Sequence, residues 1–135
     1  MIHLDTNVAI ALLNARPLIV RARFDAACDA GETVFMSNIV FHELMYGAAA
    51  SLRRGENEAK ISGLLASGIE LLSFEARDAA EAADIRAHLR RRGTPIGNYD
   101  ILIAGHARRN RALLVTANSR EFSCVPGLQV TDWAA

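Results

Sequence analysis

The chain has 135 residues, of which 51% are hydrophobic and 22% are charged, a composition typical of one folded domain with a substantial core. The formal net charge is zero, so overall charge gives no argument for nucleic-acid binding. No apolar run is long enough to cross a bilayer, and the amino terminus has no signal-peptide pattern, so we expect a cytoplasmic protein. Its two cysteines are too few for a disulfide scaffold and lack the spacing of a zinc site.

The first expected element is a short strand that stops at Asp5 and passes at once into a helix containing residues 8–13. Asp5 then stands at the carboxyl end of a strand, where open α/β sheets bind their ligands. The alternative is an ordinary helix N-cap, because aspartate accepts hydrogen bonds from the free N–H groups of a first turn. Whether other acids reach the same place decides between these interpretations.

The middle of the chain alternates helices with strands. The pattern predicts a helix over residues 18–30, whose small and apolar positions fall on one helical line. These positions are Leu18, Ala22, Ala26 and Ala30. A strand over residues 33–36 follows, and Ser37 then offers the N-cap of a helix that reaches about residue 51. A further helix over residues 53–67 leads to a third strand over residues 69–74.

The last part of the chain continues this alternation. A long helix over residues 75–92 is stopped by Gly93-Thr94-Pro95, and the next helix runs from Gly97-Asn98 to about residue 110. A buried strand is expected over residues 112–116, and a last short strand over residues 128–131. Strands separated by helices form parallel βαβ units, so we predict a three-layer α/β/α sandwich with a central parallel sheet, as a single domain over residues 1–135.

Two further acids stand at informative positions on the expected helices. Glu43 lies well inside its helix and borders the apolar stripe, although an ordinary surface glutamate on an amphipathic helix gives the same pattern. Asp100 shares its helix face with small and apolar residues, and its alternative role is stabilisation of a helix first turn. The residues that share this face with Asp100 are Ile103, Ala104 and Ala107.

Three carboxylates in one pocket require a cation, because burying like charges together is otherwise unfavourable. Oxygen ligands favour magnesium or manganese, whereas zinc prefers histidine or cysteine. Such an ion activates a bound water and offsets charge developing on a phosphate. The four histidines have no metal-binding spacing, since His42-Glu43 lacks a second histidine one turn later. We therefore interpret the histidines as structural or surface residues.

Arginine supplies nearly all the positive charge, since Lys60 is the single lysine among 15 basic residues. The arginines gather in three groups, which are Arg53-Arg54, Arg90-Arg91-Arg92, and Arg108, Arg109 and Arg111. Arginine forks match phosphate oxygens, so these groups could hold an RNA backbone. The alternative is a set of solvated helix faces, and the helix dipole alone explains arginines in a last turn.

Several segments together resemble the PIN-domain family, and within it the VapC toxins of bacterial toxin–antitoxin pairs. The likeness spans the whole chain, and its strength comes from the order and spacing of segments that are individually weak. The segments are Asp-Thr-Asn at 5–7, Ser-Asn-Ile-Val-Phe-His-Glu-Leu at 37–44, Ile-Gly-Asn-Tyr-Asp-Ile-Leu-Ile-Ala-Gly-His-Ala at 96–107, Leu-Val-Thr-Ala-Asn-Ser-Arg-Glu-Phe at 114–122, Val-Pro-Gly-Leu at 125–128 and Asp-Trp at 132–133.

The resemblance implies a five-stranded parallel sheet and a magnesium-dependent endoribonuclease, with manganese as a substitute, directed at tRNA or another structured RNA. It also implies a toxin homodimer and a cognate VapB-like antitoxin that occupies the site. Asp5, Glu43 and Asp100 match the family's metal ligands and catalytic acids, and Thr6 matches the hydroxyl that supports the first. The other supporting residues expected from the matching segments are Asn7, Ser37, Thr116 and Asn118.

Asn118 falls where many members of the family carry a fourth acid. Its amide oxygen can still accept a hydrogen bond, but one negative charge fewer weakens a second metal site, so the use of one ion or two stays open. Two other interpretations of the sequence exist. Receiver domains and haloacid-dehalogenase-type phosphatases need a lysine near a late strand, which this chain lacks. A PIN-like module that binds RNA or protein without cleavage remains the alternative.

Overall fold

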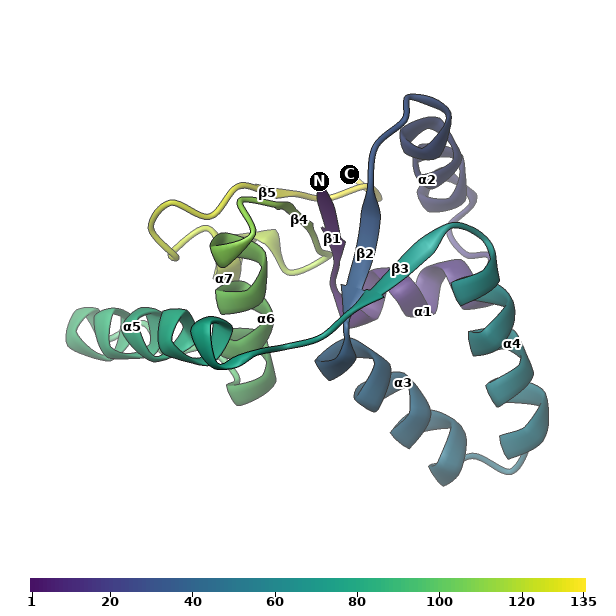
Figure 1. The fold of residues 1–135 in the computed structure, drawn as a ribbon, viewed down its shortest axis with the longest axis horizontal. Coiled ribbons are helices and arrows are strands. Elements are labelled where there is room, and N and C mark those ends of the chain that lie inside the picture. The colour runs from purple at the N-terminus through teal and green to yellow at the C-terminus, as the bar shows by residue number, and fades with distance from the viewer.

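The computed structural model describes residues 1–135, and five short parallel strands form its single sheet (Figure 1). The strands are β1 (Ile2–Leu4), β2 (Val34–Ser37), β3 (Ile69–Leu72), β4 (Leu113–Val115) and β5 (Val130–Thr131). Seven helices surround them. The helices are α1 (Thr6–Asn14), α2 (Leu18–Asp29), α3 (Asn38–Ala50), α4 (Arg54–Ala66), α5 (Ala76–Arg92), α6 (Asn98–Arg109) and α7 (Ser119–Phe122).

The helices lie on both sides of the strands, with α1 to α4 on one side and α5 to α7 on the other (Figure 1). This arrangement confirms the predicted α/β fold with a central five-stranded parallel sheet. Every predicted long helix and every predicted strand is present, with ends shifted by a few residues. The short helix α7, which follows β4, was not predicted.

The strand order β3-β2-β1-β4-β5 places a topological switch point between β1 and β4. The chain first builds outward from β1 through β2 to β3, and the segment containing α5 and α6 then returns it to the other side of β1. Leu4 lies opposite Val115 in the register of these two strands. Ligands of open α/β sheets bind at the carboxyl ends of the strands at such a point. The residues that follow β1 and β4 are therefore the first candidates for a site.

The central strands are buried on both faces, as parallel strands covered by helices must be. Leu4, Met36 and Leu114 have no exposed surface at all. The helices contribute apolar residues spaced three or four apart, and in α3 the buried positions are Val40, Leu44 and Ala48. Tight burial of β1 and β4 keeps their carboxyl ends in fixed relative positions.

The second helix is present as predicted, but the line of small and apolar residues that indicated it does not face the core. Leu18 is 77% exposed, whereas Val20 and Phe24 are the buried residues of α2. Phenylalanine removes far more apolar area from water than alanine does, so the line through Val20 and Phe24 faces the core and the line of small residues faces solvent.

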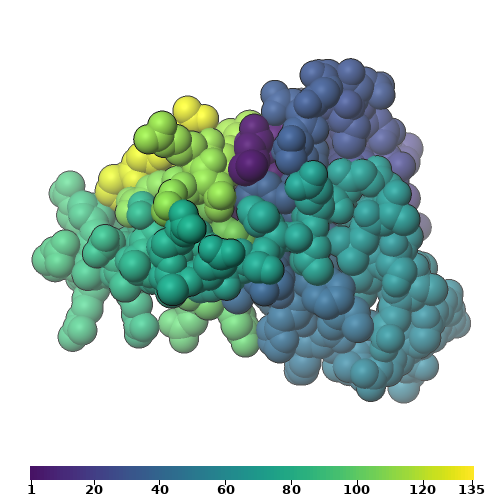
Figure 2. Space-filling view, viewed as in Figure 1, coloured from purple at the N-terminus to yellow at the C-terminus, as the bar shows by residue number.

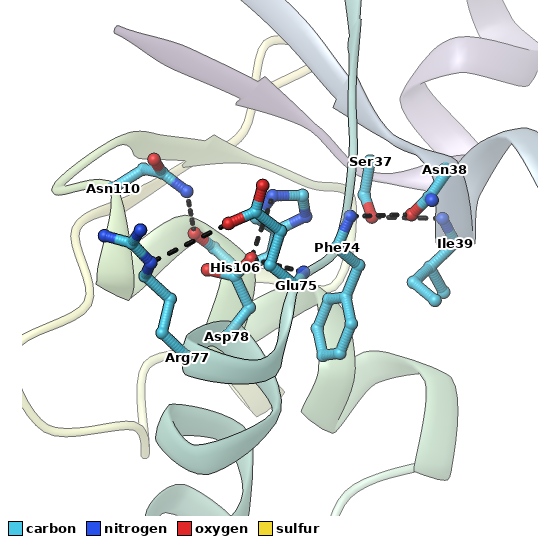
Figure 3. A network of polar contacts seen from close by, with 9 residues as sticks. All are labelled: Ser37, Asn38, Ile39, Phe74, Glu75, Arg77, Asp78, His106 and Asn110. Carbon is cyan, nitrogen blue, oxygen red and sulfur yellow. Dashed lines mark hydrogen bonds and ion pairs between the residues drawn. The ribbon is translucent and has the colours of Figure 1, made fainter.

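A polar network ties the crossover segment to the rest of the fold (Figure 3). The Asn38 side chain accepts a hydrogen bond from the Phe74 N–H at 3.0 Å, and the Glu75 N–H donates to Asp78 Oδ2 at 2.8 Å. The same Asp78 oxygen lies 3.7 Å from Nε2 of the buried His106 on α6. These contacts anchor the amino-terminal end of α5 against α6, while its other end projects away from the sheet (Figure 1).

No helix in the structure combines the length and the apolar character needed to cross a membrane.

Candidate functional site

The first acid, Asp5, follows β1 directly and is only 2% exposed. Its Oδ2 accepts a hydrogen bond from the Thr116 hydroxyl at 2.7 Å, and its Oδ1 accepts one from the Thr6 N–H at 2.8 Å. Thr116 follows β4, so the switch point itself brings these two residues together. Asp5 is also the N-cap of α1, and the two interpretations of this residue are therefore compatible.

The second acid, Glu43, is half-buried on α3 and points toward the start of α1. Its Oε1 accepts a hydrogen bond from the Thr6 hydroxyl at 2.7 Å. Ser37 fixes where α3 begins, because its buried hydroxyl oxygen accepts from the Ile39 N–H at 3.0 Å, as the predicted N-cap does. Thr6 thus touches Asp5 through its backbone and Glu43 through its side chain.

The third acid, Asp100, lies in the first turn of α6 and is partly buried. Gly97 precedes this turn, and a Cβ at Gly97 would come within 3.2 Å of Asp100 Oδ2, so glycine leaves room for the carboxylate. Burial, and then the negative charges of Asp5, Glu121 and Glu43, raise the pKa of Asp100 to about 6. The three predicted acids therefore share one electrostatic environment.

The charge of this cluster is not offset within the chain. Burial also raises the pKa of Asp5, although the hydrogen bonds from Thr116 and Thr6 act in the opposite direction. Both shifts mean that the protein disfavours the ionised form of its own carboxylates. A divalent cation would reverse that preference, and an all-oxygen donor set is the kind that magnesium and manganese prefer.

The carboxylates do not form a closed ligand cage. No three aspartate, glutamate, histidine or cysteine side chains lie close enough to hold one ion together in this structure. The Glu43 carboxylate is engaged by Thr6, and like charges repel one another. The carboxylate oxygens are suitable donors for a divalent ion, and their negative charge favours one. Rotation of the carboxylate side chains would be needed to bring the oxygens together around it.

Sequence reasoning missed one acid, Glu121, which stands on the short helix α7. Its negative charge contributes to the raised pKa of Asp100. The sequence does contain a signal for this acid, since Asn118 follows a buried strand and is followed three residues later by Glu121. A polar cap with glutamate at that spacing is typical of a helix start, and a helix here would begin next to the carboxyl end of β4. Glu121 lies three residues after Asn118, where many members of the family carry an acid.

The remaining supporting residues have separate positions. The Asn118 N–H donates to the Thr116 hydroxyl oxygen at 3.0 Å, which holds the start of α7 next to the partner of Asp5. The Asn118 side chain forms no hydrogen bond, and Asn7 is exposed on α1 and also forms none. The structure therefore connects Thr6, Thr116 and the Asn118 backbone to the acids, but it does not connect the Asn7 side chain.

The histidines divide into two kinds. His3 and His106 are fully buried without hydrogen-bond partners, and burial lowers the pKa of His3 to about 3. These two rings pack as neutral groups, with their centroids 5.6 Å apart. His42 is exposed beside Glu43, and its ring centroid lies 5.9 Å from that of Tyr99, the neighbour of Asp100.

Comparison with known proteins agrees with this geometry. The PIN domain family matches residues 2–128. The chain is 40% identical to the tRNA(fMet)-specific endonuclease VapC of Shigella flexneri over 131 residues, covering 97% of this chain and 96% of that protein. It is 39% identical over 130 residues to the protein of the same name from Salmonella typhimurium, covering 96% of each.

A solved structure of VapBC2 from Rickettsia felis, bound to a DNA fragment from their promoter, contains a similar chain. The two superpose with a TM-score of 0.91 at 33% identity, covering 98% of this chain and 99% of that one. Fold and sequence similarity agree over nearly the full length, and the chain belongs to the PIN-domain family, in its VapC group of ribonucleases.

Proposed function

We propose that this chain is the toxin of a type II toxin–antitoxin pair, a Mg²⁺-dependent endoribonuclease that inhibits translation and growth by cutting RNA in the cytoplasm. The observation that carries the proposal is the convergence of Asp5, Glu43 and Asp100 at the switch point of a PIN domain. The names of the VapC relatives favour cleavage over the alternative of a module that only binds RNA or protein.

The proposed ligands of the ion are Asp5, Glu43 and Asp100, and Mn²⁺ would replace Mg²⁺. When bound, the ion supplies an activated water and offsets negative charge on the phosphate. Asp5 is the rigid member, because Thr116 and the Thr6 N–H hold one oxygen each. The Thr6 hydroxyl orients Glu43, and Asp100 must lose its proton to take part.

The proposed substrate is tRNA or another structured RNA. Two relatives are named for tRNA(fMet), and the surface beside the acids suits an unpaired base. Tyr99 is 49% exposed and lies near the exposed ring of His42, so aromatic faces flank both Glu43 and Asp100. Stacking of bases on exposed aromatic side chains is a general way of holding single-stranded RNA.

The proposed partners are a VapB-like antitoxin and a second copy of the toxin. A cleft of about 200 Å³ lies between α1, α3 and α4, and its walls include apolar side chains of Ile10 and Leu13 together with Glu43. The carboxyl-terminal segment of an antitoxin could bury apolar residues in this cleft and bring a basic side chain to the acids. Co-expression with the small gene next to the toxin gene should then relieve the growth arrest that the toxin causes alone.

The direct test is cleavage of end-labelled bulk tRNA by the purified chain, with Mg²⁺ and with excess chelator. We expect cutting only with the metal, and a loss of about 100-fold or more in Asp5→Asn, since even outer-shell partners of a metal are worth 10–100-fold. Asp25→Asn is the matched control, because Asp25 is an exposed aspartate that pairs with Arg21 on α2. Equal cleavage by the Asp5→Asn variant, or cleavage without metal, would overturn the proposal.

A further inference from the structure

The three arginine groups, which look equivalent in the sequence, differ in the structure in whether their side chains form ion pairs. Arg54 Nε lies 2.6 Å from Glu58 Oε1, and Arg53 pairs with Glu56 at 3.7 Å, so glutamates of α4 neutralise both arginines. Arg108 is also engaged. Its guanidinium contacts Glu81 at 2.7 Å and donates to the Pro126 carbonyl at 2.9 Å. These arginines have partners inside the protein.

The arginines on the carboxyl-terminal half of α5 have no such partners. Arg86, Arg90 and Arg91 are exposed, and none of them forms an ion pair or a side-chain hydrogen bond. Arg86 and Arg90 stand one helical turn apart, where like charges destabilise a helix. The helix dipole favours the three arginines of the last turn, Arg90 to Arg92, but Arg86 lies six residues before the end of α5, outside that turn.

These side chains line a groove with a volume of about 620 Å³. The groove lies between the projecting end of α5, the turn after it and the start of α6. Pro95, Ile96 and Asn98 form the opposite wall. In Figure 2 the α5 side chains extend separately into solvent at the left edge of the molecule. The result is an open groove with an unneutralised positive wall and an apolar floor.

We propose that this groove binds the sugar-phosphate backbone of the RNA substrate, with Arg86, Arg90 and Arg91 as phosphate-binding residues. The inference rests on the proposed ribonuclease function and names where the substrate lies. Arginine forks match phosphate oxygens in geometry and charge, and the apolar floor suits a sugar or a base edge. The opposite wall ends at the amino terminus of α6, where backbone N–H groups and the helix dipole also favour an anion.

The groove lies next to the acids without containing them. Asn98 lines the groove and Asp100 belongs to the acidic cluster, and residues two apart on a helix do not face the same direction. The arginines would therefore hold phosphates that flank the cleaved bond. Their charge also offsets the repulsion between RNA and the acidic cluster, so their effect falls on substrate binding more than on the chemical step.

The test compares two triple variants of the full-length chain. The groove variant is Arg86→Gln, Arg90→Gln and Arg91→Gln, and the control variant is Arg21→Gln, Arg53→Gln and Arg54→Gln, which removes three exposed arginines that are paired on their own helices. Binding of fluorescent bulk tRNA is measured in chelator at a series of salt concentrations, and cleavage kinetics are measured with Mg²⁺.

Each lost phosphate contact lowers the slope of log K against log salt by about 0.7 to 0.9, so the groove variant should lose about 2 to 3 from that slope. Its association constant near physiological salt should fall by about 10- to 100-fold, and its KM should rise by more than its kcat falls. The control variant should keep the wild-type slope. A denaturation curve for each variant verifies that it is folded.

An unchanged slope and KM in the groove variant, with the wild type still cutting tRNA, would overturn this inference and leave the proposed function intact. A wild type that neither binds nor cuts RNA would refute the proposed function as well. If the groove variant instead changes self-association or antitoxin affinity while RNA binding is unaltered, the occupant is a protein and the inference is wrong.

Discussion

Asp100→Asn should stabilise the metal-free chain at neutral pH. The environment raises the pKa of Asp100 from 3.8 to about 6, so the folded state binds its proton more tightly than the unfolded state does. The Asp100 carboxyl therefore lowers the stability of the folded chain as the pH rises from 3.8 to about 6, because over this range the unfolded chain has already released the proton that the folded chain still holds. An asparagine keeps the shape of the side chain and carries no charge at any pH.

The magnitude follows from the shift and from the exposure of the group. A shift of this size corresponds to about 3 kcal/mol for a fully buried carboxylate, at 1.36 kcal/mol per pKa unit. Asp100 is only partly buried, so solvent screening reduces this figure, and we expect Asp100→Asn to raise the free energy of unfolding by about 1 kcal/mol at pH 7.5. The gain should vanish below about pH 4, where the wild-type carboxyl is itself protonated.

Urea denaturation without divalent ions, repeated across this pH range, measures the effect. Asp84→Asn, on the exposed side of α5, is the control and should show no comparable gain. Addition of Mg²⁺ should stabilise the wild type and should stabilise Asp100→Asn much less. A loss of stability in Asp100→Asn at neutral pH, or a gain that is the same at every pH, would refute the reasoning that the acids repel one another.

Three further substitutions test individual contacts. Gly105→Ala should lower the free energy of unfolding by about 1–3 kcal/mol in urea denaturation, because its Cβ would lie 2.7–2.8 Å from atoms of α5. The control Gly63→Ala, whose Cβ would have no atom within 4 Å, should raise the free energy of unfolding by up to about 1 kcal/mol. Equal effects of the two substitutions would contradict this packing. His3, with its pKa lowered by burial to about 3, must stay neutral in the fold, so this group alone contributes a fall in stability of about 2 kcal/mol between pH 7 and pH 5, which the opposite contribution of Asp100 partly offsets. His3→Leu should remove that contribution, so the difference in stability between the variant and the wild type should grow as the pH falls from 7 to 5, and a difference that does not change with pH would show that His3 does not resist protonation in the fold. Thr6→Val should lower RNA cleavage by about 10–100-fold with little change in stability, because Glu43 loses the hydroxyl that orients it; full activity would exclude that role.

The local sequence predicted the fold, because the signals involved are short-range, and the same kind of signal singled out Asp5, Glu43 and Asp100 as candidate site residues. Asp5 ends an apolar run, Ser37 is a strong N-cap, and Asp100 shares a helical line with small residues that prove to be buried. Such signals do not depend on the order of the strands. The period of small residues correctly indicated α2, but it did not identify the face that meets the core, which Val20 and Phe24 form because of their larger apolar area.

Contacts that depend on strand order could not be predicted. The hydrogen bond from Thr116 to Asp5 joins residues that are 111 positions apart, and it exists because β1 and β4 are neighbours in the sheet. The contribution of Glu121 to the acidic cluster has the same origin. The distinction between paired arginines on α4 and unpaired arginines on α5 likewise appears only when the side chains are placed in space.

The central claim is that one divalent ion binds between the acids at the switch point. A crystal structure of the chain grown with Mn²⁺, with anomalous scattering used to locate the metal, tests it most directly. We predict one strong anomalous peak bonded to carboxylate oxygens of Asp5 and Asp100, with Glu43 turned toward it. A map without a peak at that position, or with these carboxylates pointing into separate regions of solvent, would contradict the account.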